Sequence, residues 1–246
     1  MINIFIDFDG TITTQDVGDA MFETFGGTKC LDFIEEYRNG GISAVECFRR
    51  ECAECTGANK NALDIFLDSQ KIDSTFREFL DFCLSNKFQY FILSDGMDYY
   101  IDRILSHHQV TEVSYFANHL DLVPINGNSK VMFQPSFPFT DETCDRCACC
   151  KRNKMLTLSA DDDIIVYIGE GYSDRCPVRY ADIVFAKDEL LKYCRRENIS
   201  YFEYRSFADV LARLKSMSEN KQTKKHFGLK KHRQAQLAAR ELFIGE

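Results

Sequence analysis

Two carboxylates, Asp7 and Asp9, stand two residues apart directly after an apolar, β-branched run at residues 2–6. The run is typical of a buried parallel strand, and the spacing places both side chains on one side of the chain just before it turns at Gly10. Two ionised carboxylates ~4 Å apart repel each other by about 4 kcal/mol at an effective dielectric constant near 20. An Asx turn would need one acid. The pair therefore predicts a cation, a shared proton or a reaction at this strand end.

Three further polar groups follow along the chain. Ser94-Asp95-Gly96 closes an apolar run at residues 88–93, and Glu170 and Asp174 come after another at residues 164–168. Between these two, Lys151 begins a helix-like segment at residues 151–159. In open α/β sheets the ligand crevice lies outside the carboxyl ends of the strands. Three of the four groups are expected at such an end, so the sequence predicts one site built from them.

The elements that must position this site predict a doubly wound, Rossmann-like α/β core with a parallel sheet. Five apolar runs predict its strands, at residues 3–6, 88–93, 113–118, 164–168 and 183–186. Helical patterns lie at residues 75–85, 98–107, 173–180, 189–197 and 206–214. Residues 14–74 break the alternation and predict a helical insertion, and residues 116–139 predict a small β-hairpin around Asn126-Gly127-Asn128. The predicted domains are a catalytic core (1–13 and 75–214), a helical cap (14–74) and a basic tail (215–246).

In their order along about residues 2–190, the four polar groups resemble the four motifs of the haloacid dehalogenase superfamily. The resemblance implies that Asp7 is the nucleophile for phosphoryl transfer and that Lys151 pairs with Asp7 and the phosphate. Asp9, two residues later, can protonate the leaving oxygen and then deprotonate the attacking water, provided that its pKa is raised. The residues expected to contact phosphate or substrate are Thr11, Ser94, Asp95 and Gly96.

A Mg²⁺ ion is the expected cofactor. Asp7 and Glu170 would supply the hard oxygen ligands that Mg²⁺ prefers, and the resemblance adds the backbone carbonyl of Asp9, with Asp174 binding directly or through water. The fourth motif usually begins Gly-Asp, whereas this chain has Gly169-Glu170. Glutamate keeps the charge and adds a methylene. We therefore expect the metal to shift or to bind through a water, with activity retained.

The helical insertion after the first motif resembles the type-one cap of the phosphoserine-phosphatase-like branch. The resemblance implies a Mg²⁺-dependent phosphatase that hydrolyses a small phosphorylated metabolite through an aspartyl phosphate. The cysteine-rich approach to Lys151 and the run Gly171–Pro177 look closest to two groups: the methionine-salvage phosphatases acting on a methylthio-ketopentenyl phosphate, and the phosphocholine/phosphoethanolamine phosphatases. Phosphoserine phosphatase is a third candidate. A phosphomutase, or a phosphate-ester binding protein with impaired catalysis, for which Glu170 is the only hint, are the alternatives.

Substrate choice is expected to come from the cap. Asp16 lies where relatives place a cap acid that contacts substrate, and Arg49 and Arg50 are candidates for binding an anionic group. A helix N-cap explains Asp16 equally well, and a solvated helix face explains the two arginines.

Eleven cysteines without an export signal predict reduced thiols and a cytoplasmic location. Four of them crowd one segment: Cys144, Cys147, Cys149 and Cys150. A structural zinc site, a redox-sensitive thiol cluster and a simple family signature are the alternatives for this segment. No apolar run approaches the roughly 18 residues of a membrane span, so none is predicted.

Charge is unevenly distributed, because residues 215–233 carry a net charge of +6 in a chain whose net charge is −8. We interpret this tract as a solvated tail that pairs with the acidic body or with a neighbouring subunit, which would make a homodimer. The tract holds one aromatic residue, Phe227, and so does not favour nucleic-acid binding.

Overall fold

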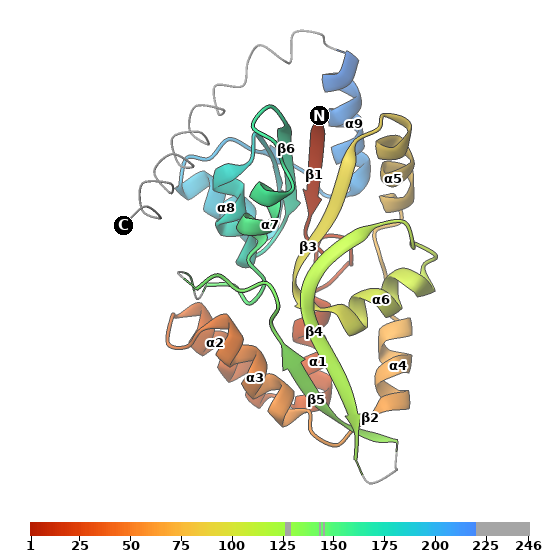
Figure 1. The fold of residues 1–246 in the computed structure, drawn as a ribbon, viewed down its shortest axis with the longest axis vertical. Helices are drawn as coiled ribbons and strands as arrows, with labels where there is room; N and C mark the ends of the chain where they lie inside the picture. Colours follow the sequence, from red (N-terminus) through yellow and green to blue (C-terminus); the bar gives the residue numbers. More distant parts are fainter. Residues whose placement is uncertain (126–128, 143, 145, 220–246) are drawn as a thin grey trace. The chain divides into compact units, whose positions relative to one another are not determined.

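The computed structural model describes residues 1–219 apart from 126–128, 143 and 145 (Figure 1). Contacts divide it into two compact units. The first unit holds Met1–Phe5, Ser74–Tyr90 and the described residues from Met155 onward, and the second holds Ile6–Asp73 and Phe91–Lys154. This grouping differs from the predicted core and cap boundaries, which stay a prediction. The basic tail beyond residue 219 lies outside the described residues.

The first unit is built on parallel strands in the order β1-β6-β7-β8. Their bounds are Ile2–Ile6, Ile164–Gly169, Ile183–Ala186 and Phe202–Glu203. Strand β7 pairs in parallel with both β6 and β8. Residues 165–168 of β6 and all of β7 are buried, which explains why these strands are continuous apolar runs in the sequence. Strand β8 has two residues, too few for an alternation pattern to predict it.

Three α-helices belong to the first unit: α5 (Phe76–Ser85), α8 (Asp188–Arg196) and α9 (Phe207–Glu219). Helices α5 and α9 lie side by side (Figure 1), because the ring of Phe207 packs 4.8 Å from that of Phe76 and 5.0 Å from that of Phe79. The predicted helix at residues 206–214 thus continues to Glu219.

The predicted helix at residues 173–180 is wrong. The segment forms two 3₁₀ turns, Ser173–Arg175 and Pro177–Tyr180. Pro177 has no N–H to donate to an α-helical hydrogen bond, and the Asp174 side chain accepts hydrogen bonds from the amides of Glu170 and Gly171. These interactions favour a tight turn over a regular helix.

The second unit has strands in the order β3-β4-β5-β2. Their bounds are Gln89–Met97, Ser114–Pro124, Lys130–Ser136 and Ala58–Asn59, and β3 enters this unit at Phe91. Strand β4 pairs in parallel with β3 up to Asn118 and then antiparallel with β5 from His119. Strand β4 therefore belongs both to the parallel sheet and to a β-hairpin with β5. The predicted hairpin is confirmed. The turn at residues 126–128 lies outside the described residues.

The helical insertion forms α1 (Val17–Gly26), α2 (Lys29–Arg38), α3 (Ala44–Glu54) and α4 (Lys60–Asp68). Side chains of Asp16, Ser43 and Asn59 cap α1, α3 and α4 by accepting a backbone N–H three residues on. Helix α2 lies beside α3, and α3 lies beside β5 (Figure 1). Helix α6 (Asp98–His107) follows the second motif, and α7 (Lys151–Thr157) begins at Lys151 of the third.

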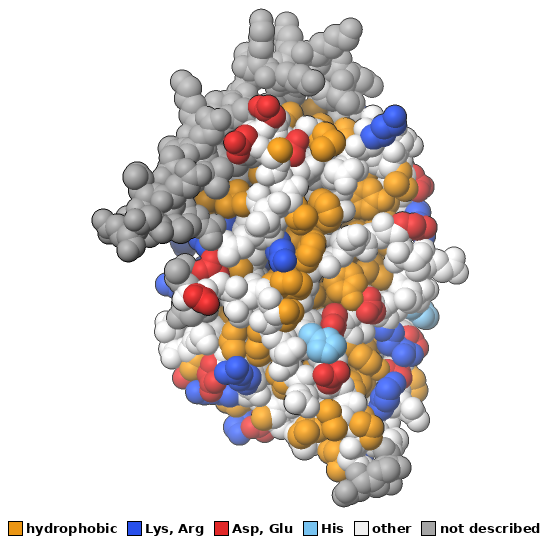
Figure 2. All heavy atoms as spheres, viewed as in Figure 1, with side chains coloured by type: hydrophobic (Ala, Val, Ile, Leu, Met, Phe, Trp, Pro, Cys, Tyr) orange, Lys and Arg blue, Asp and Glu red, His pale blue; other side chains and the backbone are white. Residues whose placement is uncertain are grey.

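The visible face of the molecule carries acidic and basic side chains interspersed with hydrophobic ones (Figure 2). Within the described residues, no helix combines the length and the hydropathy that crossing a bilayer would require.

Candidate active site

Asp7 and Lys151 form a buried ion pair in the second unit. Lys151 Nζ donates a hydrogen bond to Asp7 Oδ1 over 2.6 Å, and the Lys151 side chain is fully buried. The amide of Phe8 donates to the same oxygen over 2.8 Å. A buried ammonium is costly without a partner of opposite charge, so position 151 at the start of α7 must face the acid that follows β1. The structure thus brings together the predicted nucleophile and the predicted lysine.

Asp9 is half-buried, and donors approach both of its carboxylate oxygens. Oδ1 accepts hydrogen bonds from the amides of Val17 and Gly18 at the start of α1, over 3.2 and 3.3 Å. Oδ2 accepts from Tyr100 Oη over 2.7 Å and from Ser94 Oγ over 3.3 Å. Burial raises the pKa of Asp9 to about 7, with a further increase from the charge of Asp16, and these increases outweigh the lowering by the Tyr100 hydrogen bond.

The second motif packs against Asp9. Ser94 is fully buried in β3, and its Oγ also accepts a hydrogen bond from the amide of Gly96 over 2.9 Å. A side chain at position 96 would collide with Tyr100 Oη and Asp9 Oδ2. Only glycine fits there, so the predicted Gly96 is explained by close packing of the site. Sequence reasoning missed Tyr100, whose one signal is its place four residues after Gly96.

The two other residues predicted to contact phosphate or substrate, Asp95 and Thr11, have no hydrogen bond to Asp9 among those described. Asp95 Oδ1 accepts a hydrogen bond from the amide of Cys149 over 2.6 Å, which ties the second motif to the loop that leads into Lys151. Thr11 Oγ1 is buried and has no hydrogen-bond partner among the residues described. Substrate contact by either residue stays a prediction.

The three candidates in the helical insertion, Asp16, Arg49 and Arg50, also have different surroundings. Asp16 is exposed and caps α1, accepting from the amide of Asp19 over 2.8 Å. The Arg49 guanidinium lies 5.8 Å from the ring centre of Phe137. Arg50 pairs with Glu36 and Glu46, which favours the solvated-face interpretation for that arginine.

Glu170 and Asp174 belong to the first unit. Asp174 is fully buried and accepts hydrogen bonds from Tyr167 Oη over 2.6 Å and from the amides of Glu170 and Gly171 over 2.9 Å each. A side chain at position 169 would collide with this carboxylate. Asp174 therefore shapes the turn that presents Glu170, which is half-buried. Metal binding by both residues stays a prediction.

The cysteine-rich segment has buried thiols at Cys147, Cys149 and Cys150 and a half-buried one at Cys144. Burial raises the pKa of the Cys149 and Cys150 thiols, which disfavours the reactive thiolate. Within the described part of the chain, no three His, Cys, Asp or Glu side chains are grouped as ligands for a metal ion.

The predicted role of Asp9 as a proton donor can be tested by pH dependence. If the protonated carboxyl donates to the leaving group, kcat/KM should fall as the pH rises through the pKa of about 7. Asp16→Asn removes a charge that raises this pKa and keeps an N-cap, so the fall should move to lower pH. Tyr100→Phe removes a hydrogen bond that lowers the pKa, so the fall should move to higher pH. Profiles of kcat/KM against pH for the three proteins check this, and shifts in one common direction would contradict it.

Comparison with known proteins adds a family. A family model described as "Putative Phosphatase" matches residues 2–200. A 2-hydroxy-3-keto-5-methylthiopentenyl-1-phosphate phosphatase from Bacillus cereus (strain B4264) is 28% identical over 227 residues, covering 89% of this chain and 99% of that relative. Pdp3-interacting factor 1 from Schizosaccharomyces pombe is 28% identical over 215 residues, covering 84% and 92% of the two chains.

Solved structures share the fold. A phosphoserine phosphatase described as a phospho-aspartyl intermediate analogue superposes with a TM-score of 0.66 at 16% identity, covering 86% of this chain and 97% of that chain. A HAD family hydrolase from Salmonella enterica subsp. enterica serovar Typhi gives a TM-score of 0.66 at 19% identity, covering 85% and 69%. These likenesses confirm the predicted Rossmann-like α/β fold.

Proposed function

Since the chain belongs to the putative phosphatase family, in the phosphoserine-phosphatase-like branch of the haloacid dehalogenase superfamily, and is a phosphoric monoester hydrolase, we propose that it hydrolyses a small phosphate monoester through an aspartyl phosphate on Asp7. The observation that carries the proposal is the buried Asp7–Lys151 ion pair beside Asp9, whose pKa is raised to about 7. A nucleophile, a cation and a proton donor are the groups that this reaction needs.

In the first step, a carboxylate oxygen of Asp7 attacks phosphorus and the bond from phosphorus to the ester oxygen breaks. The proton of the Asp9 carboxyl goes to that departing oxygen, so an alcohol leaves. The Lys151 ammonium, which contacts Asp7, offsets negative charge that builds up on the transferred group.

In the second step, Asp9 is a carboxylate and accepts a proton from water. The water oxygen attacks phosphorus, the bond from phosphorus to Asp7 breaks, and inorganic phosphate leaves. The hydrogen bonds from Tyr100, Ser94 and the α1 amides stabilise the ionised form of Asp9 between the steps. Asp7 and Asp9 return to their starting states.

The predicted ligands suit Mg²⁺ chemically, because Asp7, Glu170 and the Asp9 carbonyl are all hard oxygen donors. Asp174, whose oxygens hold the amides of Glu170 and Gly171, would position Glu170. When bound, the cation would supply positive charge opposite the phosphoryl oxygens.

Glu170 provides a test of the metal proposal. Glu170→Asp keeps the charge and should preserve turnover with a changed Mg²⁺ requirement. Glu170→Ala removes a carboxylate and should raise the Mg²⁺ concentration for half-maximal activity at least about tenfold, because Mg²⁺ loses its water reluctantly. Titration of Mg²⁺ into the metal-free proteins measures this. The same Mg²⁺ requirement in the wild type and both variants would show that Glu170 is not at the metal.

A panel of phosphorylated metabolites, assayed with and without Mg²⁺, tests the function itself. Steady release of inorganic phosphate is the expected result, and isomerisation without release would indicate the phosphomutase alternative. Relatives named for methylthiopentenyl phosphate make that ester the first to test.

We also propose a cytoplasmic location, supported by the absence of disulfides among the described residues, which include all eleven cysteines.

A further inference from the structure

A buried asparagine on β4 holds the turn that carries the second motif. Asn118 is fully buried, and its Nδ2 donates a hydrogen bond to the main-chain carbonyl of Asp95 over 2.6 Å. The opposite orientation of the amide would place two acceptor oxygens against each other, so the donor faces Asp95. Asn118 Oδ1 has no hydrogen-bond partner among the described residues. The mechanism described above does not use this side chain.

The backbone around Asp95 explains why a side-chain donor is needed there. Strands β3 and β4 pair in parallel up to Leu93 and again at Met97, and the register shifts between these two residues. The shift leaves residues 94–96, the second motif, in a β-bulge where the main-chain ladder is interrupted. A main-chain carbonyl inside a protein then needs another donor. Asn118, which lies opposite Met97, is that donor for Asp95.

Strand β4 holds the far end of the same turn as well. The amide of Leu120 donates to Asp98 Oδ1 over 2.9 Å, and His119 Nδ1 lies 2.5 Å from Asp98 Oδ2. Asp98 is the first residue of α6. Together with Asn118, these contacts tie residues 95–98 to three consecutive residues of β4.

This turn presents two hydrogen-bond donors to Asp9. Ser94 Oγ and Tyr100 Oη lie on either side of the turn along the chain, and they contact Asp9 Oδ2 over 3.3 and 2.7 Å. Gly96, inside the turn, leaves the room that the Tyr100 hydroxyl occupies. A displaced turn would therefore take both donors away from the acid that the proposed mechanism uses as proton donor.

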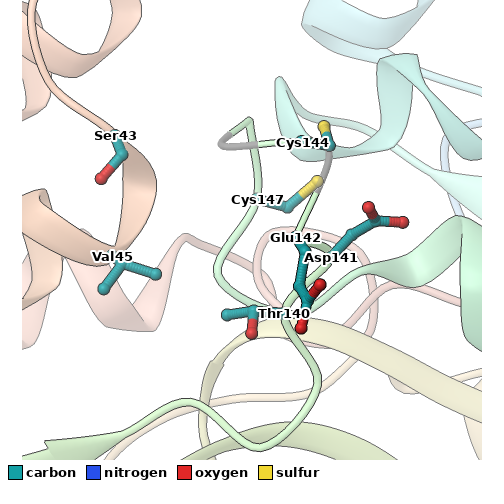
Figure 3. A pocket seen from close by; sticks show the side chains of 7 residues that line it. All are labelled: Ser43, Val45, Thr140, Asp141, Glu142, Cys144 and Cys147. Atoms are coloured by element: carbon teal, nitrogen blue, oxygen red, sulfur yellow. The ribbon is translucent and has the colours of Figure 1, made fainter.

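A separate contact holds the Asp95 side chain. Its Oδ1 accepts from the amide of Cys149 over 2.6 Å, in the segment that leads to Lys151. Nearer its start, this segment is held by Asp141, which Figure 3 shows among the side chains that line a cavity of the second unit. Asp141 Oδ2 accepts from Asn153 Nδ2 over 2.6 Å. A substitution of the asparagine on β4 therefore removes one anchor of the turn and leaves this other one in place.

We propose that Asn118 is a positioning residue for phosphoryl transfer, because its amide fixes the bulge from which the second motif reaches Asp9. The inference rests on the proposed function and adds a residue to that site. Asn118 acts through the turn and not on the substrate. Its loss should lower kcat and change KM little, because the groups that it positions act on charge and protons during the reaction.

Asn118→Ala should lower kcat about tenfold to a hundredfold and change KM less than about threefold, since a misplacement of about 1 Å can cost about 10² in rate. Asn3→Ala is the matched control. Asn3 is also buried on a strand, its Oδ1 likewise has no partner in the described part of the chain, and its Nδ2 donates to the carbonyl of Leu158, outside the four motifs. The control should lose thermal stability and keep a near wild-type kcat. Equal losses of kcat in the two variants would overturn the proposal.

Asn118→Asp keeps the shape of the side chain and replaces the donor with a carboxyl group. The ionised form would repel the Asp95 carbonyl, whereas the protonated form, which burial favours, can donate to it. The ratio of its kcat to that of Asn118→Ala should rise at least about threefold as the pH falls from about 8 to about 5.5. The ratio cancels titrations that both variants share, such as those of Asp9, Asp98 and His119. A ratio near one throughout this range would overturn the proposal. If Asn118→Ala does not fold, the ratio of Asn118→Asp to the wild type should show the same rise.

Hydrogen exchange gives a readout that does not need turnover. Amide exchange in peptides that cover residues 94–98 should be at least about fivefold faster in Asn118→Ala than in the wild type, and unchanged in Asn3→Ala. Mass spectrometry measures both rates. Faster exchange without hydrolysis of any ester by the wild type would retain Asn118 as the anchor of this turn and reject the proposed function. Hydrolysis by the wild type, with unchanged exchange and kcat in Asn118→Ala, would retain the function and overturn the inference.

Discussion

Replacing Asp7 with Asn should reduce kcat on the order of 10⁴-fold or more, because it removes the proposed nucleophile. The amide keeps an oxygen that can accept from Lys151 and Phe8, so the hydrogen bonds of the site can persist. The charge of the buried Lys151 then lacks its carboxylate, and we expect a lower thermal midpoint with a native fold. Stopped assays of phosphate release and circular dichroism measure the two effects.

Asp7→Glu is the matched control, because it keeps the charge and moves the oxygen by one methylene. Its kcat should fall nearly as far as that of Asp7→Asn, while the ion pair with Lys151 can still form. A near wild-type kcat in correctly folded Asp7→Asn protein would mean that another group attacks phosphorus, and the proposed mechanism would be wrong.

Replacing Asp9 with Asn should produce the second-largest effect, and its size should depend on the leaving group. General acid catalysis contributes about 10² to 10⁴-fold. We therefore expect a loss near the upper figure for an alkyl phosphate, whose alkoxide leaves only with a proton. The loss should be much smaller for the first step with p-nitrophenyl phosphate, whose phenolate leaves readily. Burst kinetics of nitrophenol release isolate that first step.

The Asn side chain can still accept from Val17, Gly18, Tyr100 or Ser94, so the surroundings of position 9 should be retained. The control is Ser94→Ala, which removes one of these donors and leaves the acid in place. An Asp9→Asn loss that is equal for both classes of ester would show that Asp9 has a structural role and donates no proton.

The sequence predicted the parts of the site whose residue type is dictated by local physics. An apolar strand followed by Asp7 and Asp9, or by Ser94 and Gly96, combines a burial signal with polar residues that a buried strand end would otherwise exclude. Lys151 is predicted from the resemblance of the motif order alone, and its burial beside Asp7 is visible only in the structure. Within the second unit, the structure pairs Lys151 with Asp7 and Ser94 with Asp9.

Other parts of the site and of the fold have no comparable signal in the amino-acid sequence. The amides of Val17 and Gly18 hold Asp9 through backbone groups that every residue possesses. Tyr100 reaches Asp9 because Gly96 leaves room for its hydroxyl, a tertiary contact that helical periodicity does not encode. The sequence predicts a helix at residues 173–180, where the structure has two 3₁₀ turns, because the hydrogen bonds of the Asp174 side chain that favour these turns have no signal in a periodic pattern.

The covalent intermediate tests the central claim most directly. Wild-type protein mixed with excess substrate and quenched in acid within milliseconds should yield a peptide containing Asp7 that carries one phosphoryl group, identified by mass spectrometry. The phosphorylated fraction should decay at the rate of phosphate release once substrate is exhausted, and Asp7→Asn should yield none. A phosphoryl group on another residue would contradict the account, as would full-rate phosphate release by protein in which Asp7 is never phosphorylated.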